Sequence, residues 1–105
     1  MGILVRRLGK PGPLVSSSDS RQLRSGYVVL EPGKEVGEHE TGCGEELVVF
    51  TDGTAEVSFG QKRRRVHAPA AMLVPAHTLH NVKNKSKAPL RYVYVYVRVT
   101  DSSSS

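Results

Sequence analysis

The sequence predicts an all-β domain, and three observations lead to this prediction. Valine occurs 15 times and isoleucine once, and the stiff, β-branched valine side chain favours extended strands. Glycine, proline, asparagine and aspartate divide the chain into short stretches, as turn residues do. No stretch keeps its apolar residues at the spacing of a helix with capping residues at its ends. We therefore expect eight or nine short strands that form a closed barrel or a sandwich.

The length of 105 residues fits a single domain. We expect residues 1–25 to add a first strand and a loop to this domain, residues 26–99 to form its barrel core and residues 100–105 to be a flexible tail. The first residues lack the long apolar stretch of a signal peptide, and no apolar run is long enough to cross a membrane. Cys43 is the only cysteine, so no internal disulfide is expected, and the cytoplasm is the expected location.

The expected strands follow one another along the chain. A first strand over residues 3–8 precedes a loop of glycine, proline and serine over residues 9–20. The remaining strands are expected at residues 27–30, 36–41, 47–50, 54–59, 62–68, 72–74, 79–83 and 90–99. Asp52 and Gly53 predict a hairpin between the buried strand 47–50 and its successor, because a tight hairpin turn needs a positive φ angle.

The last expected strand, residues 90–99, has the clearest pattern in the chain. Valines and tyrosines alternate along it with a strict period of two, which is typical of a strand. Either face could meet the core, and covering both faces would suit a dimer. The tyrosines are expected to pack, or to line a binding cavity if their face points inward.

The net charge of +5 at pH 7 raises the question of a nucleic-acid partner. The basic residues are scattered except for the run at residues 62–65, which has no aromatic stacking residue beside it. Lysine and arginine on an exposed edge strand discourage pairing with other sheets. We interpret the run as a solvated edge strand, and we expect no nucleic-acid partner.

Three residues supply the chemistry that the sequence offers most clearly: His39, Glu46 and His80. Imidazole and carboxylate groups are ligands that suit Fe, Mn, Ni, Cu or Zn at neutral pH. Each of the three residues lies in an expected strand or at its end, so the folding of an all-β domain can bring them together. The sequence thus predicts a pocket for a divalent transition metal inside a small barrel.

The spacing around the first two of these residues resembles the first motif of the cupin superfamily. That motif consists of glycine, five residues, His-x-His, three or four residues, glutamate, six residues and glycine. Gly33, His39, Glu46 and Gly53 occupy its positions at the same spacing. Thr41 stands where the family has its second histidine. The resemblance therefore leaves three protein ligands, with coordination positions open for water, oxygen or substrate.

A later stretch resembles the second cupin motif, which runs glycine, five residues, Pro-x-Gly, two residues, histidine, three residues and asparagine. Pro75, His80 and Asn84 match this motif in spacing, while Pro69 and His77 occupy its two glycine positions. With both motifs in order, the resemblance implies a single small cupin-type β-barrel of jelly-roll topology with about eight to ten strands.

The metal ligands that the resemblance implies are His39, Glu46 and His80. Glu45 would take the place of Glu46 if the strand were shifted by one residue. His77 could be an additional ligand or an acid or base beside the metal, or it could lie at the rim of the barrel. Cys43, on a loop flanked by glycines, could bind the metal as a thiolate or be an inert thiol.

Two functions follow from the resemblance. The first is a metal-dependent enzyme of the dioxygenase or isomerase type, or a decarboxylase-like one, that acts on a small organic molecule; hydrolysis by metal-bound water is a further option. The alternative is a non-catalytic barrel that binds a sugar or a carboxylate for storage or sensing. The resemblance also implies a homodimer. The metal content of the purified protein would separate the two functions.

Overall fold

A computed structural model describes residues 2–98 of the chain. These residues form nine strands and no helix, which confirms the all-β prediction. The strands are β1 Gly12–Val15, β2 Leu23–Leu30, β3 His39–Glu40, β4 Gly44–Asp52, β5 Thr54–Phe59, β6 Lys62–His67, β7 Ala70–Val74, β8 Leu79–Lys83 and β9 Leu90–Arg98. Nothing in this part of the chain is a helix long and apolar enough to cross a membrane. Val99 and the expected tail at residues 100–105 lie outside the described residues.

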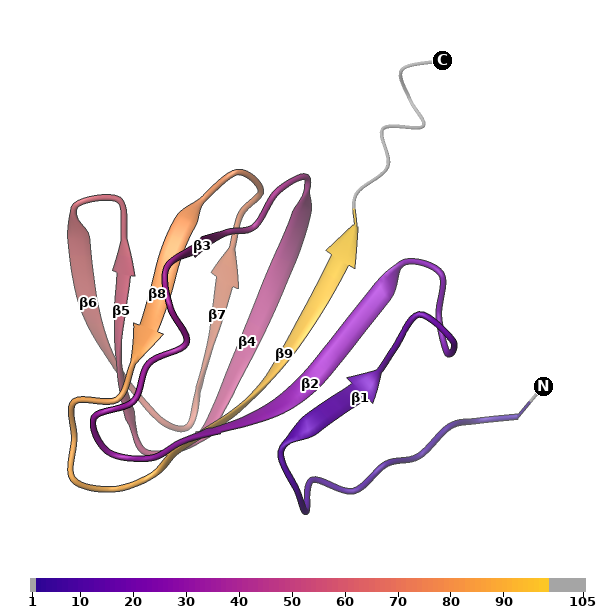
Figure 1. The fold of residues 1–105 in the computed structure, drawn as a ribbon, viewed down its shortest axis with the longest axis horizontal. Coiled ribbons are helices and arrows are strands. Elements are labelled where there is room, and N and C mark those ends of the chain that lie inside the picture. The colour runs from indigo at the N-terminus through magenta and orange to yellow at the C-terminus, as the bar shows by residue number, and fades with distance from the viewer. Residues whose placement is uncertain (1, 99–105) are drawn as a thin grey trace.

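The strands form two antiparallel sheets that pack against each other (Figure 1). The larger sheet has the order β1-β2-β9-β4-β7, and the smaller sheet has the order β3-β8-β5-β6. Several neighbours are distant in sequence, such as β2 and β9. β6 carries the basic run and is an edge strand of the smaller sheet, which confirms the interpretation of that run.

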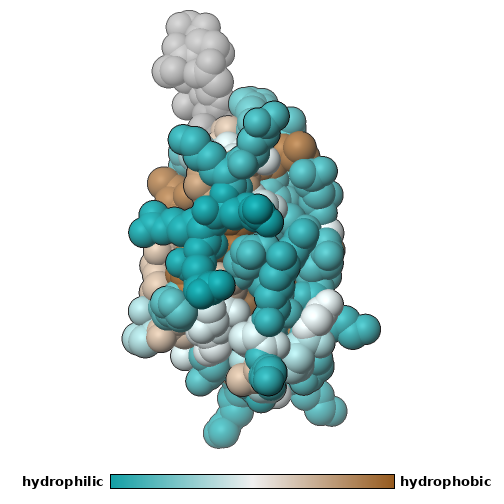
Figure 2. Space-filling view, turned by 90° about the vertical axis from the view of Figure 1, so that its left-hand side faces the viewer, coloured by the Kyte–Doolittle hydropathy of each residue, from teal (hydrophilic) through white to brown (hydrophobic). Residues whose placement is uncertain are grey.

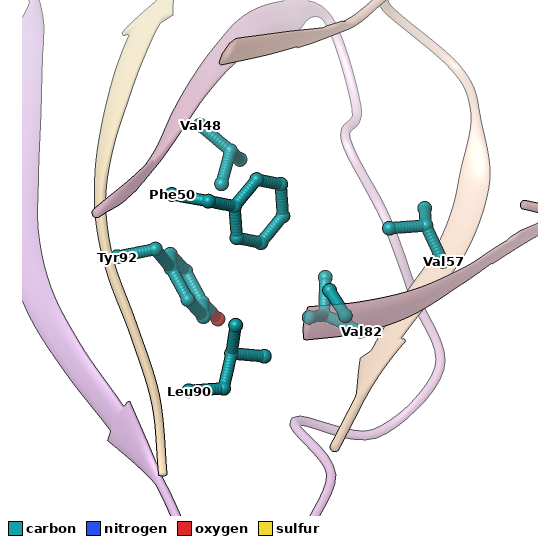
Figure 3. Packing of buried hydrophobic residues seen from close by; sticks show 7 residues of the cluster. Val48, Phe50, Val57, Val82, Leu90 and Tyr92 are labelled. Carbon is teal, nitrogen blue, oxygen red and sulfur yellow. The ribbon is translucent and has the colours of Figure 1, made fainter. Parts of the chain in front are cut away.

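The hydrophobic core lies between the two sheets. Its buried members are Val48, Phe50, Ala55, Val57, Val82, Leu90 and Tyr92, which come from β4, β5, β8 and β9. The side chains labelled in Figure 3 point into the space between the two sheets, and the rings of Phe50 and Tyr92 have centroids 5.4 Å apart. β4 alternates along its length, so Leu47 and Val49 face outward and are 41% and 37% exposed. The expectation that residues 47–50 are buried throughout is therefore wrong for these two.

The first expected strand is also wrong. Residues 2–8 form no strand, and the first strand, β1, lies inside the stretch that was expected to be a loop. Ile3 and Val5 are 95% and 80% exposed, because the described residues offer this apolar stretch no second layer to pack against. β1 forms instead because it pairs with the free edge of β2.

The turn at Gly53 is present, but the predicted hairpin is wrong. Gly53 has a φ of 91°, as the sequence predicted. However, β4 pairs with β7 and β9, whereas β5 pairs with β6 and β8. The turn therefore carries the chain from one sheet to the other. The true hairpin is the next one, in which Phe59 pairs with Lys62 across Gly60 and Gln61.

β9 alternates as predicted, and its tyrosine face is the inner one. Leu90 and Tyr92 are buried, and Tyr94 packs against the core. The valines of β9 lie on the outer face of the larger sheet, where Val97 is 37% exposed. The structure thus settles which face meets the core, which the sequence left open.

Candidate metal centre

The register of β3 and β8 brings two histidines together. Of the expected strand at residues 36–41, only His39 and Glu40 form a strand, and their partners on β8 are His80 and Leu79. Directly opposite residues of an antiparallel pair present their side chains to the same face. The imidazole rings of His39 and His80 accordingly lie with their centroids 4.2 Å apart, tilted by 57°.

A backbone carbonyl orients each imidazole. His39 Nδ1 lies 2.8 Å from the carbonyl oxygen of Gly37, and His80 Nδ1 lies 2.9 Å from that of Thr78. A carbonyl oxygen can only accept a hydrogen bond, so each Nδ1 carries a proton and donates it. A neutral ring of this tautomer has its lone pair on Nε2, which is the nitrogen then available to a metal.

Glu46 reaches the two imidazoles from the opposite sheet. It lies on β4, where Val48 and Phe50 follow it on the inner face at intervals of two residues. Its Oε1 lies 3.4 Å from His80 Nε2. One ligand atom from each of His39, Glu46 and His80 lies within 4.8 Å of the other two. The fold therefore brings together the three residues that the sequence singled out.

His80 Nε2 has no hydrogen-bond partner among residues 2–98. Its contact with Glu46, at 3.4 Å, lacks the geometry of a hydrogen bond. The His80 side chain is only 2% exposed, and an unpaired polar group at such a place costs about 1–3 kcal/mol. A divalent transition metal would use this lone pair together with the second imidazole and the carboxylate. The residues present therefore fit a metal ion.

Thr41 acts on the loop before His80. Its hydroxyl donates to the Pro75 carbonyl at 2.7 Å and accepts from the Thr78 amide at 3.0 Å. The Tyr96 hydroxyl donates to the Thr41 carbonyl at 2.8 Å. Thr41 thus bonds the backbone of the loop whose Thr78 carbonyl orients His80, and its hydroxyl is used by that backbone.

The two additional candidates lie outside the cluster. His77 is exposed, has a φ of 56° and donates its amide to the Gly42 carbonyl at 2.7 Å. Cys43 is exposed and free. Their roles as ligands, and that of His77 as an acid or base, stay predictions. Glu45 is exposed on the outer side of β4, so the register with Glu46 inward is the one present.

The sequence reasoning missed Asn81, which fixes the loop before His39. Asn81 is 4% exposed. Its Oδ1 accepts from the Gly37 amide at 2.9 Å, and its Nδ2 donates to Glu35 Oε1 at 2.8 Å. Because the Gly37 carbonyl accepts from His39 Nδ1, this network orients that imidazole. An amide side chain directly after His80, within the expected strand 79–83, was the available signal.

A cavity of 390 Å³ adjoins the cluster on the side of β2 and β9. Its apolar walls are Val28, Leu30, Val36, Val48 and Val82. Tyr92 and Tyr94 also line it, so the tyrosine face of β9 does form a cavity wall. Burial raises the pKa of Tyr92 well above its usual value, and the nearby Glu46 carboxylate and Tyr94 raise it further. The Tyr92 phenol therefore stays neutral at any physiological pH.

Two packed antiparallel sheets with a histidine and carboxylate cluster between them define a small β-barrel protein with a candidate metal centre. The family model described as the cupin domain matches residues 26–96. The chain belongs to the cupin family, which confirms the resemblance and the expected jelly-roll barrel. No curated protein matches the sequence.

Solved structures share this fold at low sequence identity. The cupin domain of Cnp3 from Schizosaccharomyces pombe superposes with a TM-score of 0.78 at 18% identity, over 85% of this chain and 64% of that chain. A Cupin 2 conserved barrel domain protein from Salinispora arenicola has a TM-score of 0.78 at 20% identity, over 98% of this chain and 92% of that chain. A predicted oxalate decarboxylase from Thermotoga maritima has a TM-score of 0.78 at 19% identity, over 85% of this chain and 79% of that chain. Likeness at such identity shows the fold alone.

Proposed function

We propose that this chain is a metal-binding cupin in which His39, Glu46 and His80 hold a divalent transition metal. The observation that carries the proposal is the buried Nε2 of His80, which has no partner in the described chain and lies beside a carboxylate and a second imidazole. Fe, Mn, Ni, Cu and Zn all accept such a ligand set. Three protein ligands leave room for a substrate at the ion.

The proposed activity is that of an enzyme of the dioxygenase or isomerase type acting on a small organic molecule. A bound metal would act as a Lewis acid toward an oxygen of the substrate or supply redox chemistry. The protein contributes the apolar walls beside the cluster, which exclude water, and the neutral Tyr92 phenol, which can donate a hydrogen bond. The predicted oxalate decarboxylase from Thermotoga maritima makes decarboxylation a third reaction to test.

Elemental analysis of the purified protein tests the metal proposal. We expect a stoichiometric amount of one transition metal, and we expect His39→Ala and His80→Ala to lose it. His67→Ala is the matched control, because His67 is exposed and its Nδ1 is paired with Thr54 Oγ1 at 3.0 Å. Metal retained by His80→Ala, or lost equally by His67→Ala, would contradict the proposal.

The second candidate function is a barrel that binds a small ligand without catalysis. The replacement of the family's second histidine by Thr41, whose hydroxyl is engaged by the loop backbone, favours it. In that case the protein contains no metal and its unfolding is insensitive to chelators. Thermal unfolding with and without a chelator therefore separates the two functions.

The proposal includes a homodimer formed through the outer face of the larger sheet. On this face Leu47 pairs with Leu73 on β7 and Val95 on β9, and Val49 pairs with Val93. Leu47 and Leu73 are 41% and 63% exposed. An apolar sheet face of this kind is stabilised when an identical face covers it.

Light scattering after gel filtration tests the dimer. Leu47→Lys should give a monomer, because it places a charge at the centre of the outer face. Leu79→Lys is the control, since Leu79 is an equally exposed leucine, at 45%, on the smaller sheet. A monomeric wild-type protein, or a Leu47→Lys variant that stays dimeric, would contradict this part of the proposal.

A further inference from the structure

The basic run on β6 is divided between the two faces of the smaller sheet. Arg64 pairs with Val57, which is 3% exposed and belongs to the core. Arg63 and Arg65 pair with Ser58 and Glu56, which alternate with the core positions of β5. Directly opposite residues share a face, so Arg64 starts on the inner face and its two neighbours lie on the outer one. Figure 2 shows that hydrophilic side chains cover much of this side of the molecule, with hydrophobic residues visible between them.

Arg64 lines a cavity that is larger than the one beside the candidate metal centre. This cavity has a volume of 620 Å³, within the usual range for small-molecule sites. It lies between the edge strands β6 and β7, and its walls include Val57, Val66, Met72 and Val74. His80 also lines it, so the cavity extends to the candidate metal centre.

The chemistry of the lining defines the ligand that would fit. Arg64 is the only lysine, arginine, aspartate or glutamate among the lining residues. Within residues 2–98 it forms no ion pair. Arg64 is exposed, so its guanidinium can lie at the opening while its aliphatic part follows the apolar wall. A guanidinium in this position favours a planar carboxylate, which it can bind through two parallel hydrogen bonds.

The apolar walls select the rest of the ligand. A single guanidinium neutralises one negative charge, so a doubly charged phosphate would leave an unpaired charge beside valine and methionine side chains, which is unfavourable. Thr78 and His80 are the only other residues with polar side chains among those that line the cavity, so most hydroxyls of a sugar would lack a side-chain partner. A monocarboxylate with an aliphatic or aromatic body matches both the opening and the interior.

We propose that Arg64 anchors the carboxylate of an apolar monocarboxylate in the cavity between β6 and β7, with the apolar body extending toward His80. This inference names a substrate class for the proposed function, and it rests on that function only in making His80 part of the reactive centre. The binding of the carboxylate by Arg64 itself needs no metal.

The test uses metal-stripped full-length protein and titrates hexanoate, hexanamide and acetate by NMR and calorimetry. We expect hexanoate to bind, and we expect hexanamide, which lacks the charge, and acetate, which lacks the apolar body, to bind at least about tenfold more weakly. Arg64→Gln should weaken hexanoate binding by about ten- to a hundredfold. Arg63→Gln and Arg65→Gln are matched controls on the outer face of the same strand and should bind as the wild type does.

Arg64→Lys keeps the charge without the two parallel bonds and should bind between the wild type and Arg64→Gln. Thermal unfolding of each variant shows whether it is folded. No hexanoate binding by the wild type, equal binding of hexanamide, or equal losses in Arg63→Gln and Arg64→Gln would each overturn the inference. Metal content is measured separately on the same variants. If the protein as purified contains no metal but its stripped form binds carboxylates selectively, the proposed function alone is refuted. If the purified protein contains metal but the stripped form does not bind carboxylates selectively, this inference alone is refuted.

Discussion

His80 Nε2 lies 3.4 Å from Glu46 Oε1, although the two residues belong to opposite sheets. Each begins a series of inward residues that continues into the core: Val48 and Phe50 follow Glu46, and Val82 follows His80. The packing of these core residues therefore sets the separation of the sheets at the centre. The core therefore fixes Glu46 and His80, which favours a fixed geometry for these two candidate ligands. His39 is exposed on the short strand β3, and the Gly37 carbonyl orients its ring.

Asn81→Ala should weaken metal binding without removing a ligand. The substitution frees the Gly37 backbone, whose carbonyl orients His39. Loss of such an outer partner costs metal sites about ten- to a hundredfold in affinity. Calorimetric titration of the stripped protein with Zn²⁺ measures the effect. Ser58→Ala is the control, because Ser58 lies directly opposite Asn81 on β5, and an affinity that is the same in both variants would argue against the positioning role.

Gly53→Ala should destabilise the fold more than Gly33→Ala does. Both glycines have a positive φ, of 91° and 85°, so alanine is strained at either position by about 1–2 kcal/mol. At Gly53 an added Cβ would also lie 2.5 Å from the Pro89 carbonyl oxygen, whereas at Gly33 it would meet nothing within 4 Å. We expect a further loss of about 1–3 kcal/mol at Gly53. Urea unfolding of both variants measures the free energy of unfolding. Equal decreases in the two variants would mean that the turn at Gly53, which connects the two sheets, is not tightly packed.

Tyr92 should make the metal-free protein less stable in alkali. Burial raises its pKa in the folded state, above its usual value of about 10. The folded state then holds the phenolic proton more tightly than the unfolded state does. The contribution of the Tyr92 phenol to the free energy of unfolding is fully present below about pH 10. Above that pH the free energy of unfolding falls by about 1.4 kcal/mol per pH unit until the pKa of the folded state is reached.

Tyr92→Phe should not show this loss of stability in alkali, because phenylalanine has no phenolic proton. The free energy of unfolding of both proteins, measured at about pH 8 and about pH 11, provides the check. Between the lower and the higher pH, the free energy of unfolding should fall more for the wild type than for the variant. An equal fall in both proteins would mean that the Tyr92 hydroxyl is solvated in the folded protein.

Local patterns in the sequence predicted much of the fold. The period of two along β9 and the charges on β6 each identified a strand and its type, because alternation and edge charge are properties of one strand. The motif spacing identified the three residues of the cluster. Their separation in the sequence is large, so their residue types suggested the cluster and the spacing of the two family motifs supported it.

Pairing between strands could not be read in the same way. Gly53 fixed a local turn, yet the partner of each flanking strand depends on contacts with β7, β8 and β9. Residues 3–8 have the pattern of a strand but no strand beside them, since β1 takes the edge of β2. The role of Asn81 depends on the β2–β3 loop folding back onto β8, which no spacing along the chain reveals.

Anomalous diffraction from a crystal soaked in a transition-metal salt tests the metal centre most directly. The account predicts a strong peak bonded to Nε2 of both His39 and His80 and to a carboxylate oxygen of Glu46, at about 2.0–2.2 Å for a metal such as Zn²⁺. The peak should be absent from a His80→Ala crystal. A peak at exposed His67 or His77 alone, or no peak in the wild-type crystal, would contradict the account.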